Sequence, residues 1–121
     1  MTIDYHRGLL VIDSPGPIAE GFHSWSFKGP PRVSLRLNGI VVPAIIDTAI
    51  PDNAIVPEYL LDESEGTRAR VDIELAGVDF DDIDVATART GDIRLGNRLL
   101  ANFVVRIDYV HRTVALWQDS R

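Results

Sequence analysis

Hydrophobic and polar residues alternate along several short stretches of this chain, a pattern typical of β-strands with one buried face. In residues 32–37 every second residue is apolar, and Asn38-Gly39 follows before a second apolar run, 40–46. Asn-Gly between two such runs predicts a hairpin, because both central residues of a type I′ turn need positive φ. The run 40–46 is apolar apart from Pro43, so we expect it to be buried on both faces, with the proline at an edge or a bulge.

The rest of the chain also divides into short segments bounded by turn-forming residues. Further strands are predicted at residues 8–13, 71–75, 78–85, 92–95, 105–109 and 113–117. A change of parity across Asp81-Asp82 predicts a bulge, and the partial alternation over 22–27 fits either an edge strand or a loop packed on its own aromatic side chains. Apolar residues at helical spacing predict one short helix over 97–103. These short strands with a single helix predict an all-β fold, a sandwich or a closed barrel.

Length and composition limit the organisation of the chain. It has 121 residues, of which 45% are hydrophobic and 25% charged, as in a single globular domain. We expect one domain over 1–121, with a strand and a Pro/Gly-rich arm in 1–31 and the core in 32–117. No apolar run approaches the ~20 residues of a membrane-spanning helix, and the first residues lack the pattern of a secretory leader. The sequence therefore predicts no membrane segment and, by default, a cytoplasmic protein.

Charge and residue types argue against several kinds of chemistry. The net charge of −6 makes nucleic acid an unexpected partner, and the absence of cysteine excludes disulfides, thiolate nucleophiles and zinc–thiolate sites. Nucleophile-elbow and phosphate-loop motifs are missing, and the three histidines have no partner at ligand spacing. The aspartates of 79–84 lack the spacing of a calcium loop and fit a solvated strand face. We therefore expect neither a metal nor a cofactor.

Asp47 is the residue with the clearest chemical potential. It ends the most hydrophobic segment of the chain and is followed at once by turn-forming residues. Two carboxylates placed side by side at such a position cannot both ionise, so they share a proton and activate a water molecule, as in aspartic proteases. The simpler alternative is a turn carboxylate that accepts backbone N–H groups just after a strand.

Two motifs resemble those of retropepsin-like aspartic peptidases. In that family a β-hairpin leads into two hydrophobic residues followed by Asp-Thr/Ser-Gly/Ala, and this chain has Ile45-Ile46-Asp47-Thr48-Ala49 after its predicted hairpin. The second motif, Ile93-Arg94-Leu95-Gly96-Asn97, is similar to the family's hydrophobic-Leu-Gly sequence before a short helix. From Asp47 to Gly96 the motifs lie 49 residues apart, in the expected order, and 105–117 resembles the family's closing hairpin.

The resemblance implies a retropepsin-like acid protease fold and a set of residue roles. Asp47 would be the catalytic acid, Thr48 would form hydrogen bonds across a dimer, and the backbone near Ala49 would contact substrate. Leu95 and Gly96 would pack under the site. Only one complete Asp motif is present, so the resemblance implies a homodimer that hydrolyses peptide or protein substrates.

The chain also departs from the family pattern. Ala49 replaces the commoner glycine, and Ile50-Pro51 stands where a small and a polar residue are usual. The hairpin 71–85 is the flap candidate, but its turn, Ala76-Gly77, lacks a glycine-rich tip. These departures leave three hypotheses: an aspartic endopeptidase, a catalytically inactive dimeric module of the same fold that binds peptides or acts as a scaffold, and an unrelated small β-barrel binding domain. The resemblance also suggests an ion pair between Asp52 in the loop and Arg98 in the short helix, like the one in viral members of the family.

Overall fold

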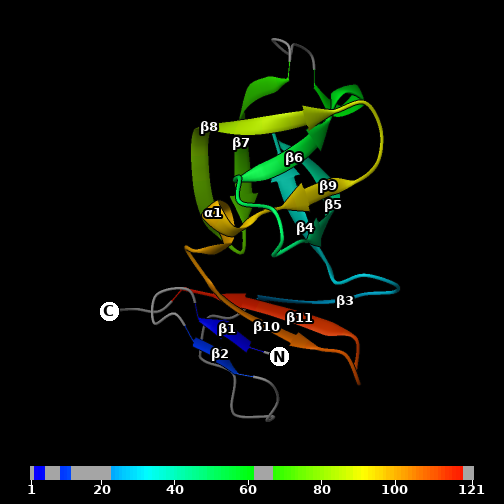
Figure 1. Ribbon diagram of the computed structural model, residues 1–121, viewed down its shortest axis with the longest axis vertical. Coiled ribbons are helices and arrows are strands. Elements are labelled where there is room, and N and C mark those ends of the chain that lie inside the picture. Colours follow the sequence, from blue (N-terminus) through cyan, green and yellow to red (C-terminus); the bar gives the residue numbers. More distant parts are fainter. Residues whose placement is uncertain (1, 5–8, 12–22, 62–66, 119–121) are drawn as a thin grey trace.

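The computed structural model describes residues 2–4, 9–11, 23–61 and 67–118, which form two stacked layers (Figure 1). One layer is a closed barrel with the strand order β4-β5-β9-β6-β8-β7, and the other is a five-stranded sheet with the order β2-β1-β10-β11-β3. Most of the predicted Pro/Gly-rich arm, residues 12–22, lies outside the described residues. The predicted all-β class, with a closed barrel and one short α-helix in the second half of the chain, is confirmed for the described residues.

The strands are short. The barrel strands are β4 (Arg32–Leu37), β5 (Ile40–Ile46), β6 (Ala54–Pro57), β7 (Arg68–Leu75), β8 (Val78–Ala88) and β9 (Ile93–Leu95). The sheet strands are β1 (Thr2–Asp4), β2 (Leu9–Val11), β3 (His23–Ser26), β10 (Val104–Asp108) and β11 (Thr113–Trp117). A 3₁₀ turn covers Glu58–Leu60, and the helix α1 covers Asn97–Leu100, shorter than the predicted 97–103.

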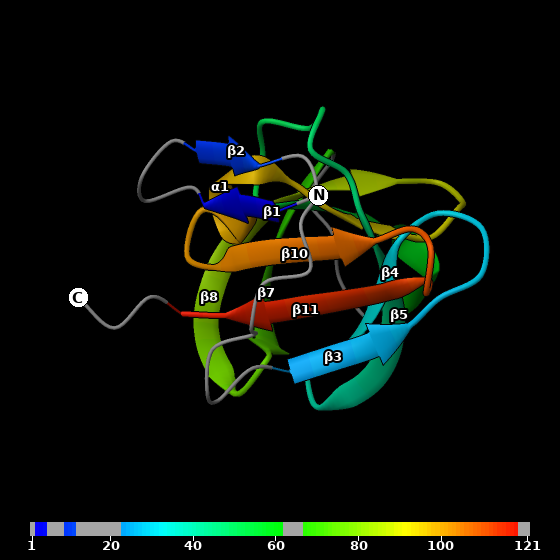
Figure 2. The same cartoon turned by 90° about the horizontal axis from the view of Figure 1, so that it is seen from below.

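Figure 2 shows the five-stranded sheet from below, with β2 and β3 at its two edges. Residues 23–26 of the predicted segment 22–27 therefore form an edge strand, because β3 pairs with β11 and ends the sheet, while residue 22 lies outside the described residues. Trp25 of this strand packs against the buried cluster, while its two serines are exposed. One buried face on an edge strand is what a period of two produces.

The β4–β5 hairpin forms around the predicted turn, with φ of 49° at Asn38 and 87° at Gly39. The expectation that the whole second strand is buried was wrong: Ile40 is 66% exposed and Val41 is 62% exposed. The reason is that β9 pairs with the last three residues of β5, so that among the described strands the first half of β5 pairs with β4 alone. Pro43 lies just before that second pairing begins, at an edge as predicted.

The β7–β8 hairpin contains the predicted bulge. Val71 pairs with Ile83 and Ile73 pairs with Phe80, so β8 has one residue more than β7 between the two pairs. Asp82 takes a φ of 51° in this extra segment. The bulge changes which face of β8 each residue occupies, which explains the shift of parity in the sequence.

The position of β9 joins two distant parts of the sequence. This strand lies between β5 and β6, parallel to the first and antiparallel to the second. Since β5 and β6 flank residues 47–53, the end of β9 is placed directly beside that loop. The two motifs recognised in the sequence therefore meet.

Both layers contribute to one buried core. Phe103, Val105 and Leu116 come from the sheet and the segment before it, and they join barrel residues such as Leu75 and Leu95 in a single cluster. None of the helices in the described part of the chain is long and apolar enough to cross a membrane. The core holds β5 and β9 in place and so fixes the base of the loop that begins at Asp47.

Candidate functional site

Asp47 begins the loop between β5 and β6, and its side chain is 23% exposed. The backbone N–H of Asp47 donates to the carbonyl of Leu95 at 3.0 Å, which anchors the start of the loop to β9. The side-chain Oδ1 accepts the N–H of Ala49 at 3.1 Å, and Oδ2 accepts Nη1 of Arg94 at 3.1 Å. The turn carboxylate considered in the sequence analysis is therefore present, together with a cation on the second oxygen.

Arg94 reaches Asp47 from β9. Ile93 and Leu95 on either side of it are buried, so the alternation of the strand directs Arg94 out of the barrel. The Arg94 side chain is 49% exposed. Sequence reasoning included Arg94 in the second motif but gave it no role, since its partner lies 47 residues away along the chain.

Asn97, at the start of α1, braces the loop that carries Asp47. Its Nδ2 donates to the carbonyl of Thr48 at 2.6 Å, and its backbone N–H donates to the carbonyl of Ile50 at 2.8 Å. Two donors from one residue therefore fix the backbone on the C-terminal side of Asp47. Sequence reasoning did not single out Asn97, although its place directly after the Leu-Gly motif was a usable signal.

Gly96 lies so close to the same loop that a side chain has no room. A Cβ atom at this position would lie 2.1 Å from the carbonyl oxygen of Asp52 and 2.8 Å from that of Ile50. The Gly96 N–H donates to the carbonyl of Asn53 at 2.9 Å. Glycine is needed here for close backbone approach, since its φ of −100° is open to any residue. Leu95 beside it is fully buried.

Thr48 and Ala49, the other two residues of the first motif, are exposed. The carbonyl of Thr48 is bound by Asn97, and the N–H of Ala49 is bound by Asp47. Contacts of Thr48 across a dimer and of Ala49 with substrate stay predictions. The surface that would make them is open to solvent.

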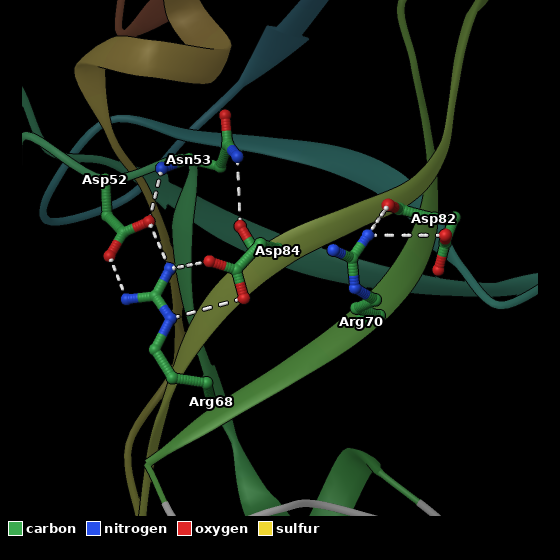
Figure 3. Close-up of polar contacts among 6 residues, drawn as sticks. All are labelled: Asp52, Asn53, Arg68, Arg70, Asp82 and Asp84. Atoms are coloured by element: carbon green, nitrogen blue, oxygen red, sulfur yellow. Dashed lines mark hydrogen bonds and ion pairs between the residues drawn. The ribbon is translucent and has the colours of Figure 1, made fainter.

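A second polar cluster fixes the far end of the loop (Figure 3). Arg68 of β7 donates to both carboxylate oxygens of Asp52, at 2.7 and 3.1 Å, and to both oxygens of Asp84 of β8, where its Nε lies 3.2 Å from Oδ1. Asn53 donates from Nδ2 to the carbonyl of Asp84 at 2.9 Å. The side-chain partner of Asp52 is therefore Arg68 and not the expected Arg98, which donates its backbone N–H to the Asp52 carbonyl.

Arg68 determines the charge state of this cluster. Its hydrogen bonds hold the pKa of Asp52 and the pKa of Asp84 below the usual aspartate value. The same two carboxylates raise the pKa of Arg68, so the cation stays protonated. The cluster is a structural brace between the loop and two strands, because its carboxylates are already paired.

The proposed flap residues form the turn of the β7–β8 hairpin. Ala76 and Gly77 both have positive φ, 52° and 77°. A Cβ at Gly77 would lie 3.4 Å from Nε2 of His23, so the turn contacts β3 of the five-stranded sheet. A role for Ala76 and Gly77 as a flap stays a prediction. Among the described residues, no three His, Asp or Glu side chains form a group that could hold a metal ion.

Comparisons with known proteins add a likeness among solved structures. No family model matches the chain, and no curated protein matches it. Among solved structures, the chain is similar to the retroviral protease-like domain of Ddi1 from Leishmania major, with a TM-score of 0.49 and 17% sequence identity. That match covers 77% of this chain and 94% of the other.

Proposed function

We propose that this protein is an aspartic endopeptidase whose active site forms from the Asp47 residues of two copies of the chain. The observation that carries the proposal is the partly exposed Asp47 carboxylate directly after the buried end of β5, on a loop braced by Gly96 and Asn97. A rigid loop is what a catalytic carboxylate needs, because its position must be fixed before substrate arrives. The resemblance of both motifs to those of retropepsin-like peptidases supports the same proposal.

The proposed reaction is the hydrolysis of a peptide bond by water. Two Asp47 carboxyl groups meeting across a two-fold axis would share one proton. The ionised group takes a proton from the water as its oxygen attacks the amide carbon, and the protonated group donates to the carbonyl oxygen. Breaking of the C–N bond, with a proton transferred to nitrogen, releases a carboxylic acid and an amine. Because one proton must stay on the pair, we expect activity to be highest at acidic to mildly acidic pH.

A second candidate is a dimeric module of the same fold that binds peptides without cleaving them. The ion pair between Arg94 and Asp47 favours it, because this pair and the Ala49 N–H already occupy both carboxylate oxygens. In that case the surface around Asp47 would bind an extended peptide without hydrolysing it. The two candidates differ in whether a bound peptide is cut.

The test is cleavage of a denatured protein by the wild type and by Asp47→Asn over a series from acidic to neutral pH. Asparagine keeps an oxygen for the Ala49 N–H but cannot supply the shared proton, so the rate should fall at least about a hundredfold. Asp79→Asn, an exposed carboxylate on β8, is the matched control and should cleave as the wild type does. Equal rates for the wild type and Asp47→Asn would remove Asp47 from catalysis, and peptide binding without cleavage by the wild type would support the binding module.

A further inference from the structure

Arg94 places a cation within hydrogen-bond distance of the proposed catalytic carboxylate. Its Nη1 donates to Oδ2 of Asp47 at 3.1 Å, and half of its side chain is open to solvent. A guanidinium has five N–H donors arranged as a planar fork that matches a carboxylate. Within the described parts of the chain, the polar contact of Arg94 is the one to Asp47, so its remaining N–H donors can bind an incoming anion.

The neighbouring strands restrict where this guanidinium can go. Arg94 is the register partner of Ile45 on β5 and of Ile55 on β6, so the three residues share the outer face of the barrel. Ile45 is buried and Ile55 is half-buried. An arginine stem between two apolar neighbours keeps its charged end near the strand surface, beside Asp47.

We propose that Arg94 makes this site selective for peptides that carry an Asp or Glu side chain next to the scissile bond. The inference rests on the proposed function. Asp47 would hold the water that attacks the scissile carbonyl, so a group bound by Arg94 must belong to a residue flanking that bond. In a symmetric dimer Arg94 is present twice, once for each side of the bond.

Charge explains why the selectivity needs arginine. An acidic substrate side chain would approach a pair of Asp47 groups that together carry negative charge, and like charges at this distance repel. The guanidinium offsets that repulsion and offers two parallel N–H donors to the substrate carboxylate. A Gln side chain of the same shape gains much less from the guanidinium, because it is neutral.

The experiment is digestion of a mixed peptide library, with the cleavage sites identified by mass spectrometry. The wild type should cut bonds flanked by Glu or Asp, and synthetic peptides that differ only by Glu against Gln at that position should differ roughly tenfold in kcat/KM. Arg94→Gln should lose this difference. Arg89→Gln changes an exposed arginine five positions earlier, in the connection between β8 and β9, and this control variant should keep the difference.

The outcomes separate the inference from the function on which it rests. Loss of cleavage in Asp47→Asn supports the endopeptidase whatever the sequence preference is. The role of Arg94 is overturned if the wild type shows no preference for acidic residues. It is also overturned if Arg94→Gln keeps that preference. If the wild type cleaves no member of the library, both are overturned. The inference is supported if Arg94→Gln loses the preference and Arg89→Gln keeps it.

Discussion

At the scale of single residues, the site depends on close contacts of the loop that begins at Asp47. Gly96 touches that loop through its backbone, and Asn97 holds it through two hydrogen bonds. The glycine could be identified from the sequence as part of a motif, but the reason for it could not. Its neighbours are carbonyl oxygens of Ile50 and Asp52, more than 40 residues away along the chain.

Gly96→Ala should destabilise the protein strongly, because the added methyl group would meet two backbone oxygens that cannot rotate away. We expect a loss of about 3 kcal/mol or more in the free energy of unfolding, measured by urea denaturation. Gly29→Ala is the control. No atom of the described residues lies within 4 Å of a Cβ placed at Gly29, so its φ of 72° is what opposes alanine, at a cost of about 1 kcal/mol. Equal losses in the two variants would contradict the close approach at Gly96.

Asn97→Ala should reduce cleavage by more than it reduces stability. The change removes the Nδ2 donor to Thr48 but keeps the backbone donor to Ile50, so the loop stays attached and becomes less fixed. We expect kcat to fall roughly tenfold or more, because misplacement of a catalytic group mainly affects the chemical step. The measurement is kcat and KM with a cleaved peptide, together with a thermal unfolding curve. The control is Asn38→Ala, at an exposed turn away from the loop. An equal fall of kcat in that variant would mean that the effect comes from a general loss of stability.

At the scale of elements, Arg68 joins three segments: β7, β8 and the loop before β6. The alternation of β7 and β8 in the sequence predicted both strands and the bulge between them. It did not predict that Arg68 binds Asp52 and Asp84, because the choice among several nearby charges depends on how the strands curve around the barrel. The sequence suggested Arg98 as the partner of Asp52, and the barrel provides Arg68 instead.

The ion pairs of Arg68 should make stability depend on pH. The pKa values of Asp52 and Asp84 are lowered in the folded protein. Their contribution to the free energy of unfolding is therefore complete above the unfolded aspartate pKa of about 3.9, and it is lost as the pH falls through the lower pKa values of the folded state. Arg68→Met should be less stable than the wild type at neutral pH, and the difference should shrink below about pH 4. Urea denaturation at a series of pH values measures both effects.

Arg70→Met is the control for that experiment. Arg70 of β7 contacts Asp82 of β8, but both side chains are largely exposed, so this ion pair contributes little to the stability of the fold. The stability of Arg70→Met should change with pH as the stability of the wild type does. If the stability of Arg68→Met changes with pH in parallel with the wild type, the ion pairs of Arg68 do not stabilise the fold as inferred.

At the scale of the whole molecule, one chain provides one Asp47, so the proposed reaction requires two copies. The specific activity should therefore rise with protein concentration, in parallel with the dimer fraction measured by sedimentation. The control is Asp47→Asn, which should dimerise equally well without cleaving peptides.

Mixing the two proteins tests whether the site is shared. When equal amounts of wild type and Asp47→Asn are refolded together, random pairing leaves about one quarter of all dimers with two wild-type chains. Activity per total protein should fall to about that fraction, because a mixed pair lacks one carboxyl group. A value near one half would indicate that each chain acts alone.

The sequence by itself determined the local features of this protein: the alternating strands, the Asn38-Gly39 turn, the bulge near Asp82, and an aspartate directly after an apolar strand. Each depends on neighbours a few residues apart. Only the tertiary structure decided that β9 lies between β5 and β6, and hence that Arg94 contacts Asp47 and that Gly96 supports its loop. Those contacts depend on strand pairing between distant segments, which the packing of the whole barrel fixes and a local pattern does not contain.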